Sequence, residues 1–474
     1  MKPVDWLKRL FKGVDGVDTH NGCHLKAGEH LDKLSEYRVW YRGDAGELSE
    51  FFSGAASHNC AERSRFWRVS GANAAVRKAH SGLPFLIVDK LAQIVTSDLI
   101  GVSFDPKEAG LLRLWQQIAA ENDFDSLLYR AVSDTLVVGD GAFKLCADPS
   151  VSRFPIIEWV PAENVGYEYD RGKLVAVTFS AVYGEYVLNE RYEPGRVTAR
   201  LFKGERQVPL GTLSQTARLA PVAEYPGDFL MAVPCMFSQS PSYPHRGVSI
   251  YHTKGCLFDG LDEVLSQWLD AVRAGRVKTY IPESLLPRNP VTGRIHNRSA
   301  FDDAIIIADD MSEGAHNTLR TEQARIDYLA FQASYNTYVD ACLQGVMSPA
   351  TLGIDVKKLD NAESQREKEK ATLSTRNKIT RALQSVLPKL VECALKTCDI
   401  MRGRQPRSCH PSVRFSSYAN PSFEAMVDTL SKAASSGILS EERMVEYLYS
   451  ESLSPAQKAE EVQRLKQRRA ESGR

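Results

Sequence analysis

Two long stretches of helical periodicity, separated by a segment of a different kind, constrain the fold of this chain most strongly. In residues 251–275 and again in 325–346, apolar side chains recur every three or four positions, as they do on one face of a helix. Gly275 supplies a stop signal at the end of the first stretch. Residues 276–324 contain short β-rich runs instead, among them the all-apolar run AIIIA. The sequence therefore predicts two long helices joined by a small β module.

The apolar face of the first helix includes Leu261, Trp268 and Leu269. A stripe with one tryptophan could border a cofactor, but it is far more typical of packing between helices. We therefore expect these three side chains to pack against the second helix. Each helix has roughly 20 residues and would span about 30 Å.

The chain before these helices changes its period once. Residues 1–135 are mainly helical in pattern, and apolar residues at 87, 91 and 95 line one side of a helix. From 136 to 235 the period is two, which predicts a mixed or antiparallel sheet and not a dinucleotide-binding fold. A Pro- and Ser-rich stretch at 238–249 marks a boundary. The predicted fold class is therefore α+β, with helices in the majority.

The residues after the second helix predict a loop and then one long helix. The stretch SPATLGIDVKKLD supplies Pro and Gly, and a helix follows from about 361 to 401. Its first half is highly charged and its second half apolar, with a kink expected at Pro388. The strand SVRFSSY and short helices over 420–474 complete the chain. The charged half of the long helix is expected to leave the core.

Composition limits the possible partners and the compartment. The 474 residues carry 59 Lys plus Arg and 59 Asp plus Glu, so no net charge draws the chain to nucleic acid or to an anionic membrane. Any DNA contact must be local. The 9 cysteines are an odd number without framework spacing, which fits a reducing cytoplasm. The N-terminus has no long apolar run, and Asp89, Lys90 and Asp98 interrupt the most apolar segment, so we expect neither secretion nor membrane insertion.

Signals for catalysis are few. The phosphate-loop, zinc-protease, serine-hydrolase and Cys-x-x-Cys motifs are absent, so the sequence predicts no enzyme and no cofactor. A group of aspartates could hold two metal ions for phosphodiester cleavage, although acids beside an apolar strand also serve to prevent aggregation. Three residues of THNGCH could bind zinc, but the stretch equally reads as an Asn-Gly turn. The first group is Asp302, Asp303, Asp309 and Asp310, and the second is His20, Cys23 and His24.

The order and spacing of several stretches are similar to the portal proteins (head-to-tail connectors) of tailed bacteriophages. The similarity extends over nearly the whole chain, and no single motif carries it. The matching stretches are VWYRGD, PFLIVDKLAQIVTSDLIGVSF, GDGAFKL, FDGLDEVLSQWLDAVRAGRVKTYIP, GVMSPATLGID, NAESQREKEKATLSTRNKI and SSGILSEERMVEYLY.

The resemblance implies a ring, commonly of twelve subunits, around a channel for double-stranded DNA. Its regions would be a wing (1–248, helical over 1–135 and β-rich over 136–235), stem helices (249–275 and 325–346), a clip (276–324), a tunnel loop (347–362), a long wing helix with a return strand (363–419), and a crown with the C-terminal tail (420–474). The family works in the virion, at one capsid vertex, and is made in the host cytoplasm.

The resemblance also assigns residues and partners. Tunnel-loop residues would face DNA without sequence specificity, namely Ser348, Thr351, Ile354, Lys357 and Lys358. The clip residues Arg288, Arg294 and Arg298 would help to dock the terminase large subunit and the head-completion (adaptor) protein. Major capsid and scaffold proteins are further implied partners, with no membrane. From the residues alone, Lys357 and Lys358 are as well explained as a solvated pair. A metal-dependent nuclease and a capsid scaffold without a channel remain alternatives.

Overall fold

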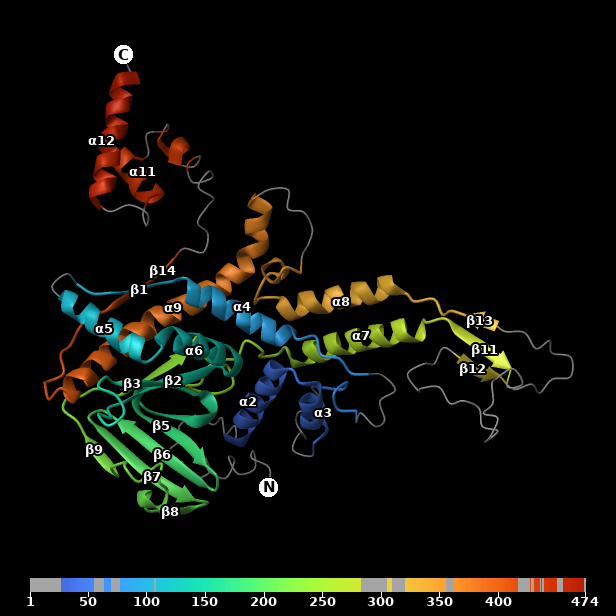
Figure 1. Cartoon of the computed structure of the whole chain (residues 1–474), viewed down its shortest axis with the longest axis horizontal. Coiled ribbons are helices and arrows are strands. Elements are labelled where there is room, and N and C mark those ends of the chain that lie inside the picture. Colours follow the sequence, from blue (N-terminus) through green and yellow to red (C-terminus); the bar gives the residue numbers. More distant parts are fainter. Residues whose placement is uncertain are drawn as a thin grey trace, which may run out of the picture. The chain divides into compact units, whose positions relative to one another are not determined.

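The computed structural model describes the chain in ten segments and two single residues (Figure 1). These are residues 27–54, 64–69, 77–105, 108–282, 305–308, 320–354, 362–416, 427, 430–434, 436, 439–449 and 455–472. The contacts divide the chain into two units, Met1–Arg414 and Phe415–Arg474. The first unit mixes helices with sheets, as the sequence predicted for an α+β protein.

The described residues between 27 and 138 are mostly helical. Their elements are α2 (Ala27–Arg42), α3 (Ala45–Ser53), α4 (Leu83–Ser97), β1 (Leu99–Ser103), α5 (Ala109–Glu121) and α6 (Phe124–Val138). Helix α4 packs against α2 and α6. Its residues Ile87, Leu91 and Val95 are almost fully buried, as their spacing predicted.

Residues 140–236 form two sheets whose strand pairs are antiparallel. In the smaller sheet, β2 (Asp140–Cys146) lies between β10 (Ala232–Met236) and β3 (Ile156–Pro161). The larger sheet has the order β4 (Val165–Asp170), β5 (Lys173–Tyr183), β6 (Tyr186–Glu193), β7 (Arg196–Lys203) and β8 (Arg206–Val208), and β9 (Val222–Glu224) also pairs with β7. The antiparallel alternative of the prediction is thus the correct one.

The stretch between the sheets and α7 is bonded into the first unit. Gly247 lies so close to Gly139 that an added Cβ would fall 2.0 Å from the Gly139 carbonyl oxygen. The Gly247 N–H donates to the Asp140 carboxylate at 2.6 Å, and Arg246 pairs with the same carboxylate at 3.0 Å. Asp140 is fully buried, so this ion pair fixes the chain just before it enters α7.

Helices α7 (Gly255–Ala274) and α8 (Tyr328–Leu343) lie side by side (Figure 1). Between them in the chain are β11 (Lys278–Pro282), β12 (Ile305–Ala308) and β13 (Arg320–Glu322). Strand β11 is the centre of this sheet, parallel to β12 and antiparallel to β13. The described structure therefore contains the predicted helix, β module and helix in that order.

The 3-10 turn η8 (Pro349–Leu352) leads to α9 (Ala362–Met401), which runs through Pro388 without a break. The apolar second half of α9 is buried against α4, α5, β2 and β10. Strand β14 (Ser412–Phe415) pairs with β1. In the second unit, α11 (Glu441–Leu448) packs against α12 (Pro455–Ser472).

Candidate functional site: the α7 and α8 helix pair

Contacts along the pair show that α7 and α8 run in opposite directions. Trp268 stacks on Phe331 with ring centroids 6.3 Å apart and meets Tyr335 edge-on at 6.4 Å. Two glycines, one within α7 and one at its C-cap, allow the close approach. A Cβ on Gly260 would lie 2.5 Å from the Tyr338 ring, and one on Gly275 would lie 2.5 Å from Ile326. As the residue number increases along α7, the residue number of the contacting partner decreases along and before α8. The two helices are therefore antiparallel.

Asp259 anchors the first turns of α7 to the segment 64–67. Its carboxylate is buried and accepts hydrogen bonds from the Ser64 hydroxyl at 2.5 Å and the Arg65 N–H at 2.9 Å. A buried carboxylate is costly unless its oxygens are fully bonded. These bonds therefore hold α7 to a segment nearly 200 positions earlier in the chain.

Asp262, one turn further, makes a second anchor. Its fully buried carboxylate accepts from the Trp67 indole N–H at 3.1 Å and from the Ser81 N–H at 2.8 Å, and it contacts His80 Nδ1 at 2.7 Å. Ser266 adds a third, because its hydroxyl oxygen accepts from the Ala79 N–H at 2.9 Å. Asp259, Asp262 and Ser266 thus form one bonded row, called here the base of the helix pair.

The end of α8 is also buried and hydrogen-bonded where it lies beside the start of α7. Val339, Cys342 and Leu343 are buried at the end of α8. The Lys254 ammonium donates to the carbonyls of Ala341 and Gln344 at 3.3 and 3.1 Å. A lysine in this position satisfies carbonyls that the helix leaves without internal partners. Leu261, which lies between Asp259 and Asp262 in the sequence, is fully buried.

The other end of the pair, called here the far end, exposes apolar side chains. Leu269 and Val272 on α7 are 52% and 51% exposed, and Tyr328 and Leu329 on α8 are 60% and 61% exposed. The prediction that Leu269 packs between the two helices is therefore wrong for the single chain. Trp268 faces α8 and is half-buried, but Leu269, the next residue, lies beyond the width that α8 covers.

The clip arginines lie outside the described residues. This applies to Arg288, Arg294 and Arg298, and also to the candidate metal ligands Asp302, Asp303, Asp309, Asp310, His20, Cys23 and His24. Within the described ranges, no group of three or more His, Cys, Asp or Glu side chains could hold a metal ion. None of the helices formed by described residues is long and apolar enough to cross a membrane.

The segment 347–354, which follows α8, is docked on α9 through Thr372. The Ser348 N–H donates to the fully buried Thr372 hydroxyl oxygen at 2.9 Å, and the Thr351 hydroxyl lies 2.8 Å from the same oxygen. Ser348 itself is 5% exposed. The prediction that Ser348 faces DNA therefore does not hold for this conformation, because the turn η8 packs the start of the loop against α9.

The rest of the loop differs from its start. Gly353 ends η8 with a φ of 71°, a conformation that suits glycine, and Ile354 is 37% exposed. Lys357 and Lys358 lie outside the described residues. The predicted tunnel-loop residues are therefore not one surface, since Ser348 and Thr351 are tied to α9 while Ile354 reaches solvent.

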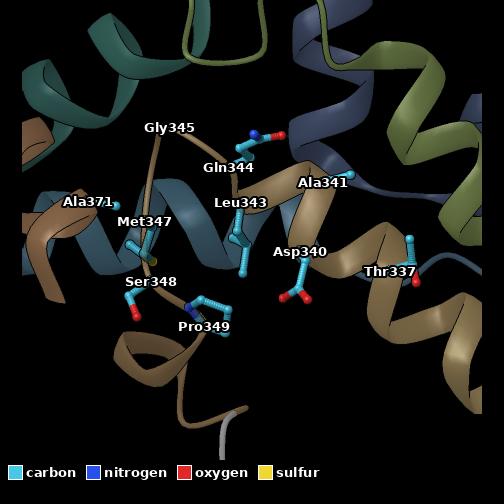
Figure 2. A pocket seen from close by; sticks show the side chains of 10 residues that line it. All are labelled: Thr337, Asp340, Ala341, Leu343, Gln344, Gly345, Met347, Ser348, Pro349 and Ala371. Atoms are coloured by element: carbon cyan, nitrogen blue, oxygen red, sulfur yellow. The ribbon is translucent and has the colours of Figure 1, made fainter. Parts of the chain in front are cut away.

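A groove of about 600 Å³ lies between the last turns of α8 and this segment (Figure 2). Asp340 lines it from α8, Gln344 from the C-cap of that helix, Ser348 and Pro349 from the segment, and Ala371 from α9. Among its described lining residues the groove holds one carboxylate and no cation. It therefore lacks the paired acid and base, or the activated nucleophile, that a catalytic centre would need.

Comparisons with known proteins give structural likeness only. No protein-family model matches the sequence, and no curated protein matches it. A chain in the "virion of native gene transfer agent (GTA) particle" is 14% identical, with a TM-score of 0.43 over 88% of this chain and 93% of that one. A chain in the "neck of empty GTA particle computed with C6 symmetry" is 13% identical, with a TM-score of 0.42 over 84% and 94%. One in the "neck of native GTA particle computed with C12 symmetry" is 14% identical, with a TM-score of 0.38 over 81% and 97%.

Proposed function

We propose that this chain is a portal protein of a tailed-phage-type virion. It would assemble as a closed ring of twelve copies at one capsid vertex, around a channel through which double-stranded DNA enters during packaging and leaves during ejection. The role is structural and not catalytic. The sequence resemblance supports this proposal, as does the order of elements: a mixed wing, two long helices joined by a small sheet, a bent segment and a long helix.

The two unlike ends of the helix pair carry the proposal. At the base, Asp259 and Asp262 are hydrogen-bonded to residues 64–81 of the same chain, so this end of the pair is held in place. Apolar side chains at the far end gain nothing from exposure to water, and burying one such side chain is worth about 1.5–3 kcal/mol. A ring of identical chains covers them, because a head-to-tail interface closes when its rotation divides a full turn.

The implied partners follow from the ring. The β11–β13 sheet lies at the far end by chain connection, and it would form the rim on which the terminase large subunit and later the adaptor protein dock. Major capsid and scaffold proteins would surround the wing. Ile354, together with Lys357 and Lys358, would line the channel, where weak phosphate contacts let a duplex slide. The charged start of α9 would pair with neighbouring subunits.

Negative-stain electron microscopy of the purified full-length chain at high concentration tests this function. Closed rings with a central channel are expected. Monomers, two-fold dimers or shells without an axial channel would contradict the proposal, and the last of these would favour a capsid scaffold.

A further inference from the structure

The middle of α9 carries a one-sided charge that the ring does not explain. Between Lys370 and Val391 the sequence is rich in basic residues and has no acidic residue, although the whole chain is neutral. Arg376 is buried and pairs with Asp98 at 2.7 Å, so it serves the core. The other basic residues of this stretch reach solvent. They are Lys370, Lys378, Arg381 and Lys389.

The solvent-reaching residues of this stretch share one chemical property. The basic ones alternate with neutral polar residues, and every member can donate a hydrogen bond. The full set is Lys370, Ser374, Asn377, Lys378, Arg381, Gln384, Ser385 and Lys389. We call this set the α9 donor face. It contains no carboxylate and no apolar side chain.

Three cations of the donor face have no ion-pair partner among the described residues: Lys378, Arg381 and Lys389. Lys378 and Arg381 are one turn apart, and like charges at that spacing destabilise a helix. These two residues, with Ser374, Asn377 and Ala382, line a groove of about 480 Å³ beside Phe237, which contributes no charge. A cation cluster without ion-pair partners among the described residues fits an anionic ligand.

We propose that the α9 donor face binds duplex nucleic acid through its phosphates. A phosphate backbone offers only acceptors, and Lys, Arg, Ser, Asn and Gln are the side chains that commonly contact it without reading sequence. From Lys378 to Lys389 the helix rises about 16 Å, which is comparable to roughly five steps of about 3.4 Å along one DNA strand. Protein interfaces instead place aromatic and other apolar residues at their centre, and this face has none.

This binding site is separate from the tunnel loop (347–362). It extends the proposed function by adding a second DNA contact, but it rests on α9 and is measurable whether or not rings form. A failure here would leave the electron-microscopy test of the ring unaffected, and the reverse is equally true.

The test compares the wild type with a K378Q, R381Q, K389Q triple variant. Glutamine keeps much of the length and the helix propensity of these side chains. The matched control is a K173Q, R200Q, R206Q triple variant, which removes three exposed cations from the larger sheet, where exposed acids such as Glu205 and Glu224 are interspersed. Circular dichroism and thermal unfolding should be the same for all three proteins.

Binding is measured by fluorescence anisotropy with labelled duplexes of about 30 base pairs, in two unrelated sequences, between about 50 and 200 mM salt. Each lost phosphate contact lowers the slope of log K against log salt by about 0.9, so three contacts lower it by about 2.7. Over that range, the wild type should therefore lose roughly forty-fold more affinity than the α9 variant. The control should match the wild type, and both DNA sequences should bind equally.

Several results would overturn the proposal. These are no DNA binding by the wild type, an unchanged salt slope in the α9 variant, an equal reduction in the control, or a strong preference for one DNA sequence. Poly-L-glutamate is the probe for the competing partner, an acidic protein surface. If the α9 variant loses affinity for poly-L-glutamate and keeps its affinity for DNA, the face binds protein and the proposal is wrong.

Discussion

The base and the far end of the α7 and α8 pair are built by opposite rules. At the base, buried carboxylates on α7 accept hydrogen bonds from residues 64–81. At the far end, Leu269 and Leu329 face solvent. We therefore expect the base to determine whether the chain folds, and we propose that the far end determines what the folded chain assembles with. Substitutions at the two ends should separate these properties.

The largest effect is expected at the base. Asp262→Ala leaves the Trp67 indole N–H and the Ser81 N–H buried without an acceptor. Removing one partner of such a network costs about 3–5 kcal/mol of the free energy of unfolding. Urea unfolding of the full-length chain measures this loss. A Ser266→Ala variant, which removes only the hydroxyl that bonds the Ala79 backbone in the same row, should lose only about 1 kcal/mol. Equal losses would show that the row is not a network.

Acid should weaken the first unit through His30. Both ring nitrogens of His30 are buried without a hydrogen-bond partner among the described residues, and burial, helped by Arg246, lowers its pKa to about 3. The unfolded chain keeps the ordinary value of 6.5 and therefore binds the proton more readily. Stability is then complete above pH 6.5 and falls by about 1.4 kcal/mol per pH unit as the pH drops from there toward 3.

The matched variant for this prediction is His30→Gln, which cannot be protonated. Between about pH 6.5 and 4.5, the wild type should lose about 2 kcal/mol more of its free energy of unfolding than the variant loses. Parallel stability curves for the two proteins would mean that His30 is solvated or partnered. Because His30 lies on α2, this pH-dependent loss of stability should not appear in measurements that report only on the far end of α7 and α8.

Two adjacent residues of α7 sharpen the comparison. Trp268 stacks on α8 but is only half-buried, so Trp268→Ala should cost about 2 kcal/mol, below the range of about 3–5 for fully buried aromatics. Leu269→Ala should change stability by no more than about 0.5 kcal/mol, because the side chain is exposed. Thermal unfolding of the dissociated chain ranks the two. The reverse order would show that Leu269, and not Trp268, lies on the packing face of α7.

Patterns within one element were predictable from the sequence. The apolar spacing of α4 and the glycine after α7 identified a buried face and a helix end, because both signals are local. The β-rich period of residues 136–235 predicted strands there, but their division into two sheets depends on pairings between distant strands, such as β2 with β10.

The candidate site was less predictable, because its partners are distant in the chain. Asp259 and Asp262 interrupt an apolar helix face, and that interruption was a usable signal. Their acceptor role still depends on Ser64, Trp67 and His80, more than 180 positions earlier. The stripe also gave no sign that α8 contacts Trp268 but leaves Leu269, the next residue, exposed. The resemblance placed Ser348 in the tunnel loop, and nothing near it in the sequence indicated that Thr372, 24 positions later, provides a buried partner.

The mass of the assembled particle tests most directly whether the far end joins copies of this chain. Mass photometry would compare the wild type with a Leu269→Gln, Leu329→Gln double variant. The control is Val175→Gln, Val182→Gln, which changes two apolar residues exposed on the larger sheet. We expect closed oligomers for the wild type and the control, and single chains with unchanged thermal unfolding for the far-end variant. A far-end variant that assembles like the wild type would contradict the account.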